Sequence, residues 1–249
     1  MQPAATRLLL IGAALLYGVA ALGNGLDRWA TTHAQTRVIP RQFAALSLPR
    51  DASAELTAGR HEQAVLLASR AVLAAPSEAG AVSMLGAALL RSDQSAKAYS
   101  AFQVSRQLGW RDLSTQAYWV TAGVSLSDQE MTARHLNALM RFAPGLPQSE
   151  EVLQLLESSP AGRAQLARYL AQGPNWLALY AKGASRLSPD LFAVRLNLLQ
   201  GAKAGGKQTD CGTVADAITD LAYSQSRYVE AAQLWQLVCR GAAQGLVHN

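Results

Sequence analysis

Small apolar residues recur every three or four positions in the stretch "AGRHEQAVLLASRAVLAAP", residues 58–76. Ala64, Ala68, Ala71 and Ala75 fall on one stripe of a helix, and Pro76 follows them. Side chains this small let another helix approach closely, and proline prevents a helix from continuing. The pattern therefore predicts a helix that packs through its alanine face and ends before Pro76.

The same arrangement recurs at a fixed period. Pro76 and Pro144 each close a helical stretch, and they lie 68 residues apart, which is twice 34. Between them, Gly86 falls in a first predicted helix, and Ala98 and Phe102 fall in a second. A period of 34 residues predicts helix-turn-helix units, in which Gly86 and Ala98 allow close helix contact and Phe102 fills the layer.

These residues resemble the tetratricopeptide repeat, whose pattern is W-x-x-L-G-x-x-Y, then A-x-x-x-F-x-x-A, then P. Three positions depart from it, since Val82 replaces Trp, Leu89 replaces Tyr, and Trp110 replaces the closing proline. The unit from 113 to 144 is more degenerate and has Thr132 in place of the first alanine. The resemblance implies an all-α protein, a right-handed α-solenoid of stacked helix pairs. Ordinary helical hairpins with accidental similarity are the alternative.

Further helices are predicted downstream. A helix is expected in "LPQSEEVLQLLESS", followed by helices at 161–172, 175–187 and 189–201 and by a Gly/Lys-rich loop at 201–210. The last segment again looks like a tetratricopeptide hairpin, with Tyr228, Ala231 and Trp235 opening its second helix opposite Ile218, Ala222 and Tyr223. The expected organisation is 1–30 anchor, 31–44 linker, 45–144 repeats, 145–209 degenerate basic helical repeats, and 210–249 terminal hairpin and tail.

The two cysteines fall at the ends of that hairpin. Cys211 starts its first helix and Cys239 lies near the end of its second, and these ends are neighbours in an antiparallel hairpin. A disulfide would place the bulk of the chain in an oxidising compartment such as the bacterial periplasm. Two buried free thiols are the alternative.

The amino-terminal residues carry the longest apolar run. Residues 8–26 would form about 28 Å of helix, close to the thickness of a bilayer core of about 30 Å. We expect an uncleaved anchor and a single-pass inner-membrane protein whose bulk is periplasmic. A cleaved signal peptide with a soluble periplasmic product, or a buried core helix, would also fit. The membrane orientation stays open, because arginines lie on both sides of the run.

The net charge of +5 is spread along the chain rather than gathered into a stripe with aromatic residues, so nucleic acid is not an expected partner. The exception is 158–209, in which seven basic residues accompany only Asp190. A solvated helix face explains them, and a surface for an anionic polymer or lipid is the alternative. The candidate contacts for such a ligand are Arg163, Arg168, Lys182, Arg186 and Arg195.

No familiar catalytic motif occurs in the sequence. The four histidines form no metal-binding array, and neither a phosphate loop nor a nucleophile elbow is found. Glu150 and Glu151 are adjacent, so on a helix they point about 100° apart and cannot face each other as an acid and base. We therefore expect no enzyme, cofactor, metal or small-molecule substrate; an enzyme of unrecognised type would need a deep pocket with converging polar groups.

The expected function is a non-enzymatic membrane-anchored scaffold that binds protein partners, namely other membrane or envelope components, in a polysaccharide-export, polysaccharide-biosynthesis or secretion assembly. In tetratricopeptide-like solenoids, the first helix of each repeat lines a groove that holds peptides or helices. The resemblance assigns this groove to Ser83, Ala87, Leu90, Arg91, Ser114, Ala117, Thr121 and Val124. The alternative is an accessory protein that binds an anionic polymer or lipid surface through 158–209.

Overall fold

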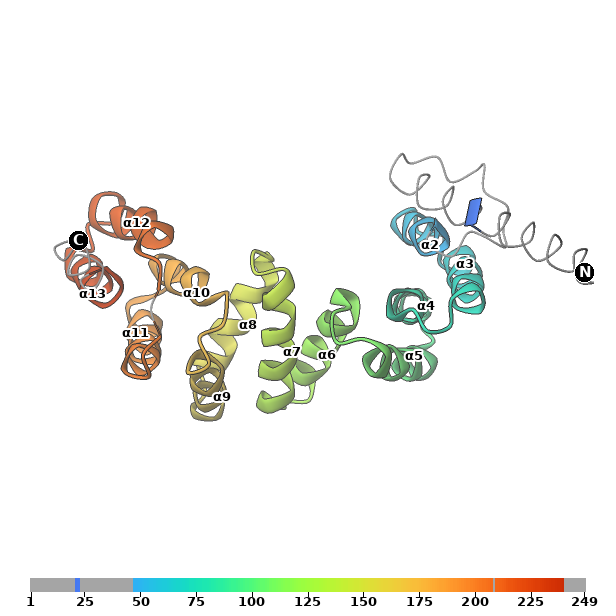
Figure 1. Cartoon of the computed structure of the whole chain (residues 1–249), viewed down its shortest axis with the longest axis horizontal. Coiled ribbons are helices and arrows are strands. Elements are labelled where there is room, and N and C mark those ends of the chain that lie inside the picture. The colour runs from blue at the N-terminus through green and yellow to red at the C-terminus, as the bar shows by residue number, and fades with distance from the viewer. Residues whose placement is uncertain (1–20, 23–46, 208, 240–249) are drawn as a thin grey trace, which may run out of the picture. The chain divides into compact units, whose positions relative to one another are not determined.

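A computed structural model describes residues 21–22, 47–207 and 209–239, and every regular element in these ranges is a helix (Figure 1). The chain divides into two compact units, one ending at Thr115 and the other beginning at Gln116. Among the described residues no helix has the length and apolar character needed to cross a bilayer. Nearly all of the predicted anchor at 1–30, the linker at 31–44 and the tail at 240–249 lie outside the described residues.

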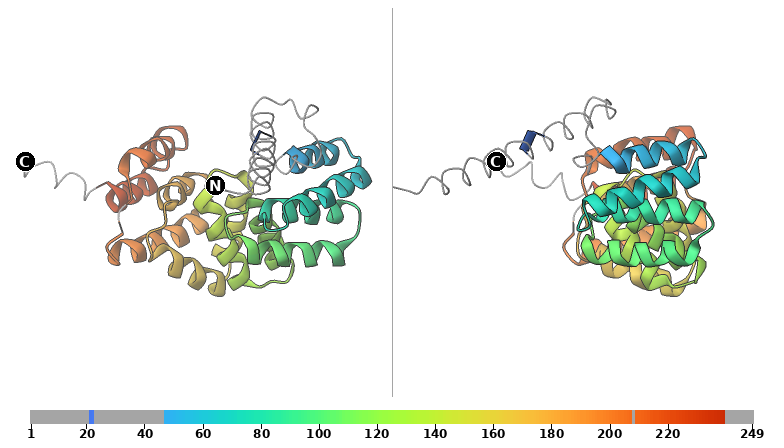
Figure 2. Two further views of the ribbon diagram at one scale, coloured as in Figure 1. Left: turned by 45° about the vertical axis from the view of Figure 1, so that its right-hand side comes forward. Right: turned by 90° about the vertical axis from the view of Figure 1, so that its right-hand side faces the viewer.

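The N-terminal unit consists of consecutive helix pairs. It contains α2 (Ser47–Thr57), α3 (His61–Ala74), α4 (Ala79–Arg91), α5 (Ser95–Leu108) and the start of α6 (Leu113–Ser125). Helix α2 packs against α3, α3 against α4 and α4 against α5, and these helices lie side by side (Figure 2). Ala64, Ala68 and Ala71 are completely buried, so the alanine stripe of α3 is the predicted packing face.

Gly86 in α4 is required by a close contact between α4 and α5. A Cβ placed on Gly86 would lie 2.9 Å from the ring of Phe102, which is itself buried on α5. Ala98 on the same helix is completely buried. These three residues therefore make the contact that the sequence pattern predicts, with the glycine leaving room for the aromatic ring.

The turns inside the helix pairs carry the same period. Gly59, Asp93 and Ser127 have φ angles of 74°, 58° and 55°, in the left-handed region, and they are spaced 34 residues apart. The residue that follows each of them donates its backbone N–H to the carbonyl of the residue five positions before the donor. This bond is typical of a Schellman-type helix end. The second helices start two residues after these positions, at His61, Ser95 and Gln129. The repeat is thus visible in the backbone, and the fold is tetratricopeptide-like.

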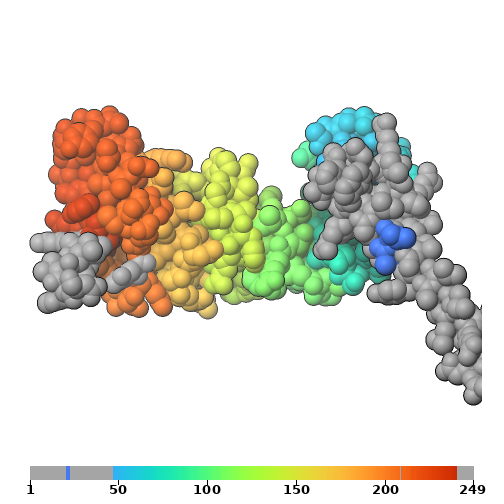
Figure 3. All heavy atoms as spheres, turned by 45° about the horizontal axis from the view of Figure 1, so that its top comes forward, coloured from blue at the N-terminus to red at the C-terminus, as the bar shows by residue number. Residues whose placement is uncertain are grey.

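The C-terminal unit continues the series of helices. It contains the rest of α6, α7 (Gln129–Phe142), α8 (Pro147–Glu157), α9 (Pro160–Leu170), α10 (Leu177–Gly183) with the 3₁₀ turn η3 (Ala184–Arg186), α11 (Pro189–Ala204), α12 (Cys211–Thr219), the π-helical turn η4 (Asp220–Ser224) and α13 (Tyr228–Val238). One apolar core runs through them from Val120 to Cys239. The atoms of this unit form one continuous mass, coloured green to red in Figure 3. The helices predicted after Pro144 are confirmed within a few residues.

The degenerate third repeat compensates for its larger side chain. Thr132 on α7 occupies the position of Ala98, and a Cβ on Gly123 of α6 would lie 2.5 Å from its Oγ1. Thr132 is buried and its hydroxyl donates to the carbonyl of Asp128. A glycine opposite the threonine therefore preserves the close approach of the two helices.

The aromatic residues of the last hairpin do not pack as expected. Tyr223, Tyr228 and Trp235 are exposed, whereas Leu221 and Leu234 are completely buried. For Tyr223 the reason is the π-helical turn at the end of α12, which inserts an extra residue and turns Leu221 toward the core. The turn residue Ser226 nevertheless has a φ of 56°, like its counterparts in the other turns.

The predicted disulfide is confirmed. The sulfur atoms of Cys211 and Cys239 are bonded at 2.06 Å, and their Cα atoms lie 5.0 Å apart. Cys211 begins α12 and Cys239 follows α13, so the bond joins the open ends of the terminal hairpin. The described residues contain no free cysteine.

Candidate functional site

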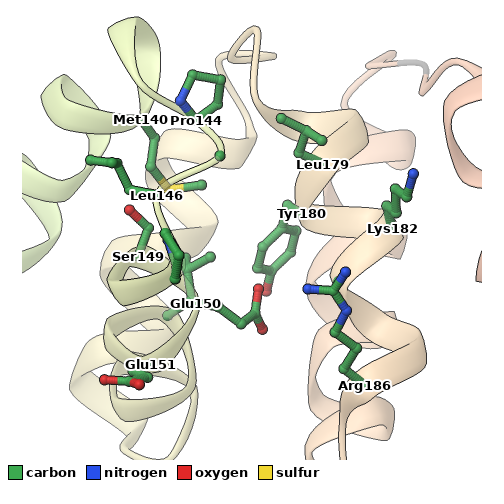
Figure 4. A pocket seen from close by; sticks show the side chains of 14 residues that line it. Met140, Pro144, Leu146, Ser149, Glu150, Glu151, Leu179, Tyr180, Lys182 and Arg186 are labelled. Carbon is green, nitrogen blue, oxygen red and sulfur yellow. The ribbon is translucent and has the colours of Figure 1, made fainter.

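A pocket of about 510 Å³ opens between α8 and α10 in the C-terminal unit (Figure 4). Pro147 is the first residue of α8, where a proline fits the helix, and with Pro144 it stiffens the connection from α7. A volume of this size is within the range of small-ligand sites. The lining residues are Met140, Pro144, Gly145, Leu146, Pro147, Ser149, Glu150, Glu151, Leu153, Leu179, Tyr180, Lys182, Gly183 and Arg186.

A buried ion pair supports the wall formed by α10. The side chains of Arg195 on α11 and Glu157 on α8 are both 0% exposed. Arg195 donates from Nε and Nη2 to the two carboxylate oxygens of Glu157, at 2.7 and 2.9 Å. The hydroxyl of Tyr180 donates to Glu157 Oε1 at 2.6 Å, and the guanidinium lies 4.5 Å from the Tyr180 ring centre. The pair is thus satisfied by hydrogen bonds, as buried charges require.

Glu150 links this ion pair to the pocket. Its Oε1 lies 2.8 Å from Arg195 Nη2, and in Figure 4 its side chain reaches from α8 toward α10. A Cβ on Gly183 would lie 2.6 Å from Arg195 Nη1 and 2.7 Å from Glu150 Oε2. Gly183 therefore allows the two charged side chains to meet against the backbone of α10. One arginine consequently forms ion pairs with carboxylates from both ends of α8.

The burial of this cluster shifts two pKa values. Burial raises the pKa of the Tyr180 hydroxyl well above its ordinary value, and the charge of Glu157 adds to the effect. Burial alone would lower the pKa of Arg195, but its hydrogen bonds to Glu157 and the charges around it raise the pKa overall. Tyr180 therefore stays protonated and Arg195 stays charged near neutral pH.

The remaining charged residues of the lining differ in direction. In Figure 4 Arg186 points from the end of α10 toward α8, whereas Glu151 points away from α10. Lys182 points away from α8, and its Nζ lies 3.8 Å from Asp216 on α12. Arg186 is exposed and has no ion pair with any described residue. Among the described lining residues, Arg186 is therefore a cation that is free to meet a ligand.

Ser149 is an unusual polar group in the lining. The residue is 3% exposed, and its Oγ has no hydrogen-bond partner in the part of the chain that is described. Only one other side-chain atom, Nη2 of Arg227, shares that property within the described ranges. A buried hydroxyl without a partner costs free energy that a bound ligand could recover.

The mouth of the pocket is apolar on both sides. Leu146 in the connection before α8 is 39% exposed, and Leu179 on α10 is 37% exposed. Met140, Leu153 and the ring of Tyr180 also contribute to the lining. Among the described residues, the lining therefore combines an apolar surface with the cation of Arg186, which has no ion pair, and the hydroxyl of Ser149, which has no hydrogen-bond partner.

The predicted groove residues are distributed over both units, so the groove as a whole stays a prediction. Leu90 and Arg91 are exposed near the end of α4, and Ser114, Ala117 and Thr121 are exposed on α6. Ala87 and Val124 are half-buried. Ser83 is a correction, because it is 2% exposed and its hydroxyl donates to the carbonyl of Gly80. The prediction that Ser83 lies on the groove face of α4 is wrong, because Ala81, Val82 and Ser83 are all buried there.

The predicted basic surface also changes. Arg195 is completely buried, so its assignment to an anionic ligand is wrong, and Arg163 donates to the carbonyl of Glu157 at 2.8 Å. Arg168 is exposed and donates to Gln165, while Lys182 and Arg186 flank the pocket. The charge imbalance of 158–209 is reduced by carboxylates of α8, which precedes this range and packs against it.

The sequence did carry a signal for the buried ion pair. Arg195 lies between Phe192, Leu196 and Leu199, which form the buried stripe of α11. A charged residue inside an apolar helical stripe indicates a buried partner, because an unpaired charge there would be very costly. The count of charges along 158–209 missed this signal because it ignored the direction in which each side chain points.

No protein-family model matches the sequence, and no curated protein is significantly similar to it. Among solved structures, one described as a functional characterisation of Pseudomonas aeruginosa PilF is similar over 78% of this chain and 97% of that chain. The two sequences are 17% identical and the TM-score is 0.42. Similarity at this level supports no transfer of function. The tetratricopeptide-like assignment instead rests on the period of helix starts, turns and close contacts described above.

Proposed function

We propose that the chain is a non-enzymatic scaffold that binds protein partners, and that the pocket between α8 and α10 is one of its binding sites. The observation that carries the proposal is the pocket's apolar mouth, where Leu146 and Leu179 expose more than a third of their surface on opposite sides. Exposed apolar residues around a concave site are typical of surfaces that bind another molecule.

The chemistry of the lining supports binding rather than catalysis. A catalytic carboxylate or tyrosine needs a free site for the proton that it transfers. Here Glu150 is ion-paired with Arg195, and the Tyr180 hydroxyl donates to Glu157. These groups hold α8, α10 and α11 together. In addition, the described residues contain no cluster of three His, Cys, Asp or Glu side chains that could hold a metal.

The proposed location is the periplasmic side of a bacterial inner membrane, with residues 8–26 as a single anchor. The disulfide at Cys211 and Cys239 supports an oxidising compartment, and the length of the apolar run supports a membrane span. The proposed assembly is of the polysaccharide-export, polysaccharide-biosynthesis or secretion type. A soluble periplasmic protein with a cleaved signal peptide is the variant of this proposal.

Affinity purification of the full chain from crosslinked native membranes tests the proposal. Leu179→Glu places a charge at the mouth of the pocket, and Leu155→Glu is the matched control, because Leu155 is 43% exposed on α8 and lies outside the pocket lining. Partners that are captured by the wild type and the control but lost from Leu179→Glu support the proposal. Identical capture by all three proteins, each folded by circular dichroism, contradicts it.

Among the predicted contacts, an anionic polymer or lipid is a second candidate ligand only for the exposed Arg168 and Arg186 and the half-buried Lys182. Binding through such cations should weaken steeply as salt rises, because it depends on screened charges. Binding through the apolar mouth should change little. Repeating the purification at low and high salt therefore separates the two candidates.

A further inference from the structure

We propose that the pocket between α8 and α10 binds an extended peptide segment in which a large apolar residue stands next to an aspartate or glutamate. This inference rests on the proposed function and specifies its ligand. The apolar side chain would enter between Leu146 and Leu179, the acidic side chain would pair with Arg186, and the peptide backbone would bond to Ser149.

The size and lining of the pocket select the apolar residue. Its volume of about 510 Å³ exceeds that of one large side chain, so part of the neighbouring backbone can enter as well. Met140 and Leu153 offer apolar contacts beneath the two leucines of the mouth. A leucine or an aromatic residue would therefore exchange exposed apolar surface for contact on several sides.

The charges of the lining select an acidic neighbour. Glu150, the carboxylate that faces α10, is ion-paired at 2.8 Å with Arg195, which it shares with Glu157, and Glu151 points away from α10. Lys182 is directed to Asp216. Arg186 is thus left as an exposed cation in the lining that points toward α8 without an ion pair to any described residue. Because its guanidinium has several donors in one plane, it matches a carboxylate.

Ser149 supplies the second, independent indication of a ligand. Ser149 belongs to the lining, and its Oγ is shielded from solvent and lacks a partner among the described residues. A peptide N–H or C=O at this point would satisfy it. Consequently Ser149→Ala should leave the stability of the free protein unchanged or slightly higher and should weaken binding, which distinguishes a ligand-binding role from a structural one.

The test uses methyl NMR of the full chain in detergent micelles, with [methyl-¹³C]methionine. Met140 lines the pocket, and Met84 of the N-terminal unit is the internal control. The probes are three peptides blocked at both ends, Ac-GSLDSG-NH₂, Ac-GSLKSG-NH₂ and Ac-GSADSG-NH₂, together with polygalacturonate as an anionic polymer. The Leu-Asp peptide should shift the Met140 signal with an affinity about tenfold higher than either other peptide, and should leave Met84 unchanged.

Two variants identify the contacts. Arg186→Glu should reverse the preference in favour of the Leu-Lys peptide, and Ser149→Ala should weaken binding of the Leu-Asp peptide roughly 2- to 10-fold. The inference is overturned if the Met140 signal moves equally with all peptides, moves with none, or moves most with polygalacturonate. If Leu179→Glu still abolishes partner capture in membranes while the peptides fail, only the ligand chemistry is wrong. If neither assay depends on the pocket, the proposed function fails as well.

Discussion

Arg195 and Glu157 form a completely buried ion pair in which two guanidinium nitrogens meet the two carboxylate oxygens at 2.7 and 2.9 Å. The pair joins α8 to α11, and the Tyr180 hydroxyl extends it to α10. The walls of the pocket are therefore held in place by a polar cluster inside an otherwise apolar core. The polar cluster thus fixes α8 and α10 relative to each other before any ligand binds.

Removal of the arginine should destabilise the C-terminal unit strongly. Arg195→Met leaves the Glu157 carboxylate buried without its partner, which is expected to cost about 3 to 5 kcal/mol in the free energy of unfolding. Adding Glu157→Gln removes the stranded charge and keeps an oxygen to accept the Tyr180 bond, so it should restore at least half of the loss. Urea denaturation followed by circular dichroism measures both effects. Independent, additive losses from the two substitutions would refute this coupling.

The disulfide should stabilise the terminal hairpin. It closes a chain separation of 28 residues, for which the loop-entropy model gives roughly 3 to 4 kcal/mol. Dithiothreitol should therefore lower the melting temperature of the wild type and leave that of Cys211→Ala/Cys239→Ala unchanged, and the variant should match the reduced wild type. Equal melting temperatures for oxidised and reduced wild type would show that the bond adds no stability. Mobility on a nonreducing gel confirms the redox state of each sample.

Alanine substitution at the two glycines of α4 should have opposite effects on the stability of the protein. Gly86→Ala would place a methyl group 2.9 Å from Phe102, and overpacking of this kind costs about 1 to 3 kcal/mol. Gly80→Ala is the matched control, because the nearest atom to its Cβ would be Asp112 Oδ1 at 3.8 Å. In Gly80→Ala, the gain in helix propensity should stabilise the protein by about 0.5 to 1 kcal/mol. Chemical denaturation measures the unfolding free energy of both variants. A Gly86→Ala variant that is more stable than the wild type would contradict the contact with Phe102.

The start of α12 should loosen in acid. Asp210 accepts bonds from the amides of Gly212 and Thr213 and from the Thr213 hydroxyl, and the Thr213 bonds in particular lower its pKa. Because the pKa of this carboxyl is lower in the folded protein, its full stabilisation is present above the unfolded pKa of 3.8. The stabilisation is lost as the pH falls below 3.8 through the pKa of the folded state. Amide NMR between pH 5 and 2 should show Gly212 and Thr213 shifting together with a midpoint below 3.8. A midpoint above 3.8 would contradict the cap.

The fold was more predictable from the sequence than the pocket was. The 34-residue period was readable because Gly86, Ala98 and Phe102 occupy contacts that tolerate few other residues. The left-handed turns at Asp93 and Ser127 were less visible, since neither residue demands that conformation. The pocket depends on side chains from α7, α8, α10 and η3, whose directions follow from helix packing rather than from local spacing. Arg186 was singled out only as a basic residue, and Ser149 only as part of a helix start.

Site-specific photocrosslinking in native membranes tests the central claim most directly. p-Benzoylphenylalanine is incorporated in the full chain at position 179, at the mouth of the pocket, and separately at position 155, outside the pocket on α8. The scaffold account predicts that irradiation yields a discrete protein adduct from position 179, that position 155 does not yield this adduct, and that the Leu-Asp peptide competes it away. Adducts of the same size and yield from both positions, or none from position 179, would contradict it.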